Sequence, residues 1–204
     1  MKFKHALSLP ALAVATLLLA ACAAPETGHD HGAAPAPQYG STGMMAGKMG
    51  GGMMKGRMAV ASLSPTQGNN VHGLVMFHQM DGGQLMVHAR ISGLKPNAEL
   101  GFHVHEVGSC ASADGTSAGG HFNPDGKPHG PPGAAHHAGD MPALKSDAQG
   151  VADQKFVLTG PTLGTGPLSV VNRSVVVHAQ PDDYTTQPTG NSGARIACGV
   201  IAAH

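Results

Sequence analysis

Two histidines stand two residues apart in the stretch GFHVHEVGSC, which covers residues 101–110. Side chains alternate between the two faces of an extended strand, so His103 and His105 would point the same way and could bind one metal ion. An isolated pair of this kind more often marks the solvated face of a strand. The metal interpretation therefore depends on where the other histidines lie.

Four further histidines and one aspartate occur in short motifs downstream. They are His121 in HFNPDG, His129 in PHGPPG, His137 in HHAGD with Asp140 three residues later, and His178 at the end of SVVVHA. Six imidazoles and a carboxylate are too many for one tetrahedral site. They fit two sites that share a ligand, because imidazole has two nitrogens. Imidazole suits copper, and histidines combined with a carboxylate suit zinc.

The segments that must position these residues have the pattern of short strands. Runs rich in Val, Leu, Ile and Phe are separated by Gly, Pro and Asn, and no segment keeps a period of 3.6 residues. A DGG turn joins the first two runs into a hairpin. The expected strands lie within residues 71–80, 84–94, 101–106, 153–159, 174–179 and 194–202. We therefore expect residues 58–204 to form one all-β sandwich or barrel.

Two long segments, 109–149 and 180–193, interrupt this spacing. Loops of such length in a compact domain are usually functional or disordered. The first contains four histidines, a cysteine and several acidic residues, which favours a functional loop.

The N-terminal segment has the pattern of an export signal. Lys2 and Lys4 precede an apolar run at 6–19, and small residues follow. This predicts a signal peptide over residues 1–21 rather than a membrane span. The LAAC sequence that ends at Cys22 resembles a bacterial lipobox, which would make this cysteine the lipid-modified first residue of the mature protein. The alternative is an ordinary cleaved signal followed by an incidental cysteine.

Residues 22–57 are rich in Gly, Ala, Pro and Met and contain few large apolar side chains. Such a segment cannot bury enough surface to offset its ordering entropy, so we expect a disordered tether. HDH at 29–31 and the Met-rich run at 44–58 concentrate imidazole and thioether donors that suit copper. A flexible linker of biased composition explains them equally well.

Two cysteines remain once Cys22 is set aside. Cys110 and Cys198 form an even pair in an exported chain, and oxidising compartments favour a disulfide. Loop-closure entropy for residues this far apart gives an upper stabilisation of roughly 4–5 kcal/mol. We therefore expect these two cysteines to be bridged.

The charge balance argues against a nucleic-acid binder. Residues 58–204 contain seven Lys and Arg against ten Asp and Glu, a net charge of −3 with neutral histidines. Tyr and Phe are scarce and Trp is absent from the chain, so platforms for stacked bases are scarce as well.

Five motifs together resemble one family. GFHVHEVGSC, GGHFNPDGKPHG, HHAGDMPAL, HAQPDDY and GARIACGVI occur in the order found in exported bacterial copper/zinc superoxide dismutases, and they span most of residues 58–204. The resemblance implies an eight-stranded Greek-key β-barrel, an immunoglobulin-like sandwich, with two long functional loops. The KPNAELGFHVHE sequence departs from the family pattern before the copper strand, so the connection there is expected to be built differently.

The resemblance also implies a role for each matching residue. Copper would be bound by His103, His105, His121 and His178, and zinc by His121, His129, His137 and Asp140. His121 would thus bridge the two metals and carry a proton during turnover, and Arg195 would be the active-site arginine. Asp182 would accept hydrogen bonds from one copper-side and one zinc-side histidine, or else be an ordinary loop aspartate. His136 would replace His137 if the assignment slips by one position.

The activity implied is dismutation of the superoxide anion to dioxygen and hydrogen peroxide, with copper cycling between Cu(II) and Cu(I) and with structural Zn(II). The protein would protect the bacterial cell envelope, located in the periplasm and anchored to a membrane by lipid on Cys22; a homodimer is left open. Two other classes compete: a copper and zinc carrier without turnover, and a zinc hydrolase with Glu106 as base. The second is weaker because Glu106 follows His105 on a strand and would face away.

Four other histidines match no ligand position. We expect His72, His78 and His88 to lie on strand surfaces, and His204 to be a frayed terminus.

Overall fold

The computed structural model describes residues 56–204 of the 204-residue chain. The predicted signal peptide, the lipidation site at Cys22 and nearly all of the predicted tether lie outside the described residues. Within the described part, no helix is long and apolar enough to cross a membrane.

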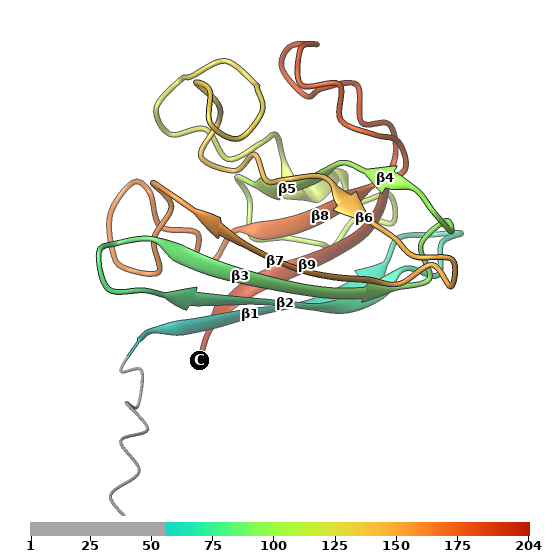
Figure 1. The fold of residues 1–204 in the computed structure, drawn as a ribbon, viewed down its shortest axis with the longest axis horizontal. Coiled ribbons are helices and arrows are strands. Elements are labelled where there is room, and N and C mark those ends of the chain that lie inside the picture. The colour runs from blue at the N-terminus through green and yellow to red at the C-terminus, as the bar shows by residue number, and fades with distance from the viewer. Residues whose placement is uncertain (1–55) are drawn as a thin grey trace, which may run out of the picture. The chain divides into compact units, whose positions relative to one another are not determined.

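The described chain forms antiparallel strands and one short 3-10 helix (Figure 1). The bounds are β1 Met58–Pro65, β2 His72–Gln79, β3 Leu85–Ser92, β4 Glu99–Leu100, β5 Phe102–His105, η1 Thr116–Ala118, β6 Leu144–Lys145, β7 Ala152–Leu158, β8 Ser174–His178 and β9 Arg195–Ala203. Seven strands pair in the order β5-β8-β9-β1-β2-β3-β7, and β4 pairs with β6. Consecutive strands are therefore neighbours only in part: β7 stands at one end of the seven-strand order, whereas β8, the next strand along the chain, stands beside the other end.

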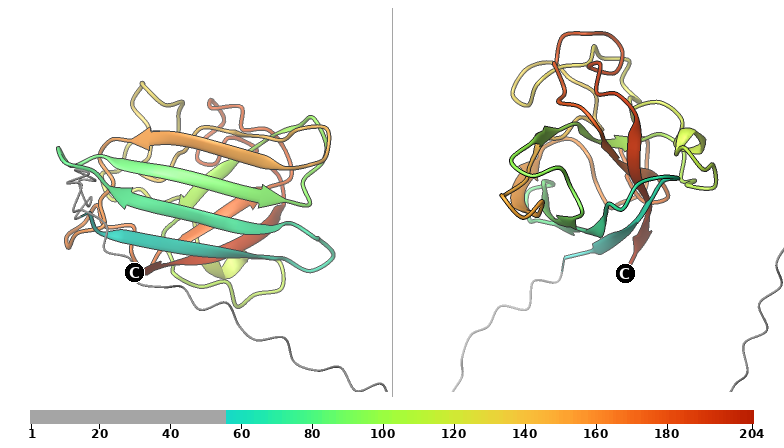
Figure 2. Two further views of the ribbon diagram at one scale, coloured as in Figure 1. Left: turned by 60° about the horizontal axis from the view of Figure 1, so that its bottom comes forward. Right: turned by 90° about the vertical axis from the view of Figure 1, so that its right-hand side faces the viewer.

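The two sheets curl into a barrel (Figure 2). β4 and β5 are one extended stretch broken at Gly101, so counting them together gives eight strands. The Gln154 side chain on β7 joins that strand to β6, donating to the Ala143 carbonyl at 3.0 Å and accepting from the Lys145 N–H at 2.9 Å. The predicted all-β Greek-key barrel is confirmed.

Every second side chain along the strands points inward, and these side chains fill the barrel. In β1, Ala59, Ala61 and Leu63 are buried, whereas Met58 and Ser62 point outward. The sequence reasoning did not assign β1 as a strand, because small alanines at the inward positions give a weak hydrophobic signal. It also missed the two-residue strands β4 and β6.

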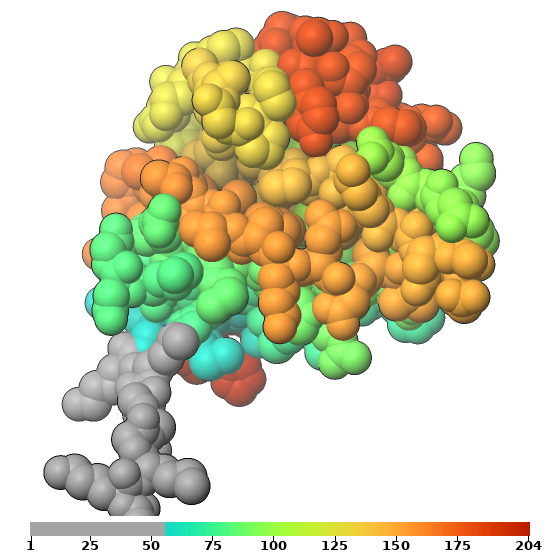
Figure 3. Space-filling model, in the orientation of Figure 1, coloured from blue at the N-terminus to red at the C-terminus, as the bar shows by residue number. Residues whose placement is uncertain are grey.

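Two long connections leave the barrel on the same side. Residues 106–143 and 179–194 stand beyond β5 and β8, and their outer parts pack together as two adjacent lobes (Figure 3). Gln187 in the second connection ties them together: its side-chain oxygen accepts from the His129 N–H at 2.8 Å and its amide donates to the His129 carbonyl at 2.9 Å.

Candidate metal centre

Three histidines of the centre project from strands. His103 and His105 lie on β5 and His178 ends β8, which pairs with β5. All three are buried, because the long connections cover this face of the barrel. Alternation therefore places the two β5 histidines on one face, and the connections make that face interior.

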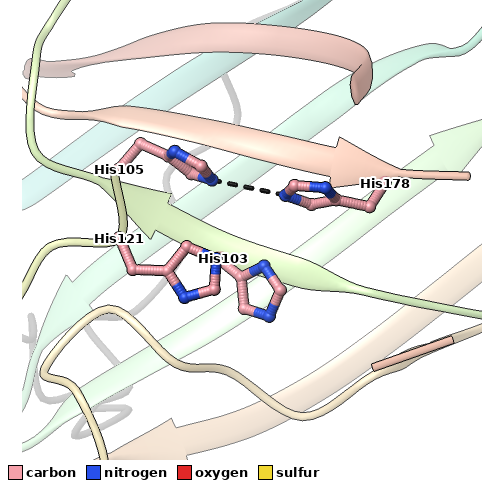
Figure 4. Close-up of side chains that lie close together, drawn as sticks. All are labelled: His103, His105, His121 and His178. Carbon is pink, nitrogen blue, oxygen red and sulfur yellow. Dashed lines mark hydrogen bonds between the residues drawn. The ribbon is translucent and has the colours of Figure 1, made fainter. Parts of the chain in front are cut away.

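His121 joins these three from the first connection. It forms an isolated β-bridge with His105, and its ring lies 4.0 Å from the His103 ring between centroids. Figure 4 shows the four imidazoles turned toward one another. One ligand atom from each of His103, His105, His121 and His178 lies within 4.8 Å of the others.

A second group shares His121. His121, His129, His137 and Asp140 also place ligand atoms within 4.8 Å of one another. Asp140 Oδ1 accepts a hydrogen bond from His121 Nδ1 at 2.9 Å, and Oδ2 accepts from the His137 N–H at 3.0 Å. His129 Nδ1 lies 3.0 Å from Asp140 Oδ2, but the two atoms form no hydrogen bond.

The choice between the two adjacent histidines is made by geometry. His136 Nδ1 donates to the His137 carbonyl at 2.7 Å, which occupies that ring outside the group. The structure thus brings His137, and not His136, together with Asp140.

Backbone carbonyls determine which nitrogen of two rings in the first cluster, His105 and His178, is protonated. His105 Nδ1 lies 3.0 Å from the Gly119 carbonyl and His178 Nδ1 lies 3.2 Å from the Gly193 carbonyl. A carbonyl can only accept, so both Nδ1 atoms carry protons and both Nε2 atoms present lone pairs. These Nε2 atoms are 3.3 Å apart, the contact drawn dashed in Figure 4. Two lone pairs at that distance repel unless a cation lies between them.

Burial keeps these imidazoles neutral. It lowers the pKa of His103 to about 4, that of His105 to about 2 and that of His178 to about 3. Neutral imidazole is the form that binds metals.

The donor set fits copper and zinc. Within residues 56–204, four buried ring nitrogens have no hydrogen-bond partner: His103 Nδ1, His121 Nε2, His129 Nδ1 and His137 Nδ1. Buried polar atoms without partners are costly, and each of these four ring nitrogens belongs to one of the two clusters. Four imidazoles suit copper, and three imidazoles with a carboxylate suit zinc.

Asp182 forms a hydrogen bond with one histidine of each cluster. Its Oδ2 accepts from His103 Nε2 at 2.6 Å and its Oδ1 from His129 Nε2 at 2.8 Å. Burial alone would raise the pKa of Asp182, but these hydrogen bonds and one from the Tyr184 N–H lower it to about 2. The carboxylate therefore stays charged and turns Nδ1 of both rings toward the clusters.

Arg195 lies at the start of β9, paired in register with His178. Its guanidinium donates to the Gly115 carbonyl at 2.7 Å and to the Gly119 carbonyl at 2.6 Å. The Gly119 carbonyl thus accepts hydrogen bonds from both Arg195 and His105. The half-buried arginine lines an open depression with Asp114 and Gly193.

The predicted disulfide is confirmed. Cys110 is bonded to Cys198, with Cα atoms 5.7 Å apart. This bond fastens the connection that carries Gly115 and Gly119 to β9, the strand of Arg195.

Three residues near the centre were not found from the sequence. Gln187 holds the His129 backbone, and Tyr184 stacks on the His129 ring with planes 11° apart. Gly190 has a positive φ of 64°, and a Cβ there would lie 1.9 Å from Asp182 Oδ1. The available signal was the short TGNSG sequence near the end of the second long loop, whose glycines permit such a close approach.

The remaining candidates lie elsewhere. His72 and His88 are on strand surfaces and are absent from both clusters among the described residues. Glu106 is exposed and its carboxylate accepts from the Gly120 N–H at 3.0 Å, as expected for a side chain that faces away.

Comparisons with known proteins agree with this geometry. The family described as copper/zinc superoxide dismutase (SODC) matches residues 71–201. The superoxide dismutase-like protein YojM of Bacillus subtilis (strain 168) is 42% identical over 136 residues, which cover 63% of this chain and 68% of that protein. Superoxide dismutase (Cu-Zn) 2 of Aquifex aeolicus (strain VF5) is 41% identical over 150 residues, which cover 70% of this chain and 85% of that protein.

A solved structure is also similar. The crystal structure of a SOD-like protein from Bacillus subtilis shares 40% sequence identity with a TM-score of 0.63, covering 69% of this chain and 95% of that chain. The matched residues include every member of the two clusters. The chain belongs to the copper/zinc superoxide dismutase family.

Proposed function

We propose that the protein dismutates superoxide to dioxygen and hydrogen peroxide. The observation that carries the proposal is the pair of buried clusters that share His121 beside the guanidinium of Arg195. His103, His105, His121 and His178 would hold copper, and His121, His129, His137 and Asp140 would hold zinc. Bound copper supplies a one-electron couple between Cu(II) and Cu(I), which permits oxidation of one superoxide and reduction of another.

Arg195 would guide the anionic substrate. The domain has a net charge of −3, so attraction must be local. Arginine stays charged at all physiological pH values, and two carbonyls fix its guanidinium at the depression. Local focusing of this kind raises encounter rates by roughly 10- to 1000-fold.

His121 would handle the proton that the reaction requires. Its Nδ1 is held by Asp140 on the zinc side, while its Nε2 faces the copper side with no hydrogen-bond partner among the described residues. Nε2 is therefore the atom at which a proton could be taken up and released close to the substrate. The zinc side would keep the ring oriented while this happens.

We also propose that the protein works in the periplasm, with residues 1–21 removed, Cys22 lipid-anchored and residues 22–57 as a tether to the domain at 58–204. The disulfide supports an oxidising compartment. Cys22→Ser should release the protein from membranes. The measurement is the membrane-bound fraction of the parent protein and of the variant after cell fractionation. Equal membrane retention of the variant would contradict lipid anchoring.

The test of the activity is superoxide removal by the full chain loaded with copper and zinc, beside His121→Ala matched for copper content. We expect fast turnover in the parent protein and a large loss in the variant. Absence of turnover in the fully loaded parent would favour a metal carrier.

Arg195→Ala tests the guidance of substrate. We expect a lower rate and a weaker dependence on ionic strength with copper still bound, because the attraction is electrostatic. Arg90→Ala is the matched control, since it removes the same charge from an exposed position on β3. Equal salt dependence in both variants would contradict the role of Arg195.

A further inference from the structure

The outward face of β1, β2 and β3 carries methionine and histidine side chains. Odd-numbered apolar residues of these strands are buried, so the even-numbered residues point outward. Met58, Met76 and Met86 are among them, and Met58 is 44% exposed. Methionine is usually an interior residue, as Met141 is here. Three outward thioethers on neighbouring strands therefore require an explanation.

Strand register aligns two of these thioethers with an imidazole. Met58 on β1 lies opposite His78 on β2, and His78 lies opposite Met86 on β3. Side chains directly opposite one another have Cβ atoms about 4.5–5.5 Å apart. Met58, His78 and Met86, which we call the Met/His row, thus form a continuous line across three strands. The left view of Figure 2 faces the sheet that carries them.

Other histidines on this face are already engaged. His88 Nε2 lies 2.6 Å from an Asp153 carboxylate oxygen, and His72 contacts the Asn70 carbonyl and the Ser92 hydroxyl. His78 instead lies against a glycine: a Cβ on Gly56 would be 2.3 Å from His78 Nε2. The backbone that leads into β1 thus passes directly beside this ring.

The donors of the row select a particular kind of metal ion. Thioether ligands are soft and select Cu(I) over ions that prefer oxygen, and imidazole also suits copper. Methionine has three rotatable bonds, so its sulfur can adapt to a coordination position. The row contains no carboxylate, unlike the buried zinc-side cluster with Asp140.

We propose that Met58, His78 and Met86 form a surface site for Cu(I), separate from the buried clusters. In the sequence, the rest of the Met-rich run at 44–58 precedes Met58, with methionines at positions 44, 45, 49, 53 and 54. The inference rests on strand register and ligand chemistry and does not depend on superoxide dismutation.

The test uses the full chain with its copper and zinc loaded and with methionine methyl groups labelled with carbon-13. Ag(I), a redox-inert ion with the ligand preference of Cu(I), is titrated in and followed by NMR. We expect the Met58 and Met86 methyl signals to shift together and to saturate, while the signal of buried Met141 stays in place. Unshifted Met58 and Met86 signals would overturn the proposal.

Three variants separate the row from the tether and from nonspecific binding. His78→Gln should weaken Ag(I) binding at the two methyl groups by at least about tenfold, since even residues behind metal ligands contribute 10- to 100-fold. His72→Gln on the same face is the control and should leave the binding unchanged. Replacing the tether methionines by leucine should preserve the Met58 and Met86 shifts; their loss in that variant would also overturn the proposal.

Discussion

The two halves of the candidate metal centre are positioned by different means. His103, His105 and His178 stand on β5 and β8, and backbone pairing fixes where their Cα atoms lie. His129 and His137 lie in the first long connection, outside the strands and outside its two isolated β-bridges. A few polar contacts, and not backbone pairing in a sheet, hold these two residues in place.

The contacts that hold the loop-borne half can be named individually. Gln187 holds the His129 backbone, Asp182 holds the His129 ring, and Asp140 accepts from the His137 N–H. Each net hydrogen bond stabilises by about 0.5–1.5 kcal/mol, so single substitutions can displace this half. Folding of the barrel, by contrast, suffices to bring the strand-borne half together. Zinc affinity should therefore be more sensitive than copper affinity to changes outside the ligands.

The largest effect is expected from Asp182→Ala. This change leaves His103 Nε2 and His129 Nε2 without their acceptor, and loss of such a partner lowers metal affinity by about 10- to 100-fold. Zinc should be lost more than copper, because β5 still holds His103. Competition with chelators of each metal measures this. Asp183→Ala is the control, since within residues 56–204 that exposed carboxylate forms hydrogen bonds only with Thr185 and Thr186. Equal losses of both metals in Asp182→Ala would contradict the comparison.

The second largest effect is expected from Gly190→Ala. Its φ is 64° and a Cβ would lie 1.9 Å from Asp182 Oδ1 and 2.5 Å from His129 Nε2, so the carboxylate must move. Gly126→Ala is a close control, with a φ of 61° and no atom of the described part of the chain within 4 Å of the added Cβ. Both variants should lose about 1–2 kcal/mol of stability from the left-handed backbone, measured by urea unfolding. Only Gly190→Ala should lose zinc, and equal zinc retention would show that the loop adapts.

Gln187→Ala should have a smaller effect. Two hydrogen bonds to the His129 backbone disappear, which should cost about 1–3 kcal/mol in total and speed zinc release several-fold. Copper retention should not change. Gln149→Ala at an exposed turn is the control, and identical zinc release from both variants would remove the role of Gln187.

At neutral pH, the smallest effect is expected on the folding stability of the metal-free protein. Burial lowers the pKa of His103 to about 4, of His105 to about 2 and of His178 to about 3, whereas unfolded histidine titrates near 6.5. Below pH 6.5 the unfolded chain gains protons that the folded chain does not, so stability falls as pH falls toward 4. Urea unfolding of the metal-free chain at pH 7 and pH 5.5 measures this. Unchanged stability would mean that the strand-borne rings are not held neutral by the fold.

Much of the centre could be predicted because its motifs are local. The spacing of His103 and His105 assigns them to one face, and the step from His137 to Asp140 places two donors in one turn of chain. The approach of His178 to these residues and the bond from Cys110 to Cys198 each join segments that are distant in the sequence. They were predicted from the order of the motifs and the number of cysteines, and not from the local pattern of the chain.

Other features could not be predicted, since they depend on contacts between those segments. The backbone carbonyls of Gly119 and Gly193 decide which nitrogen of His105 and His178 is protonated, and no pattern of side chains encodes that choice. Gln187 resembles any loop glutamine until the two connections are packed together.

By itself, the sequence determined the all-β fold, the cysteine pair that forms the disulfide and the identity of the donors, because alternation, composition and motif order are properties of the chain alone. Tertiary structure decided that His137 rather than His136 joins the cluster and that Met58, His78 and Met86 align on the outer face. Both depend on side-chain direction and strand register, which are fixed only when the barrel closes.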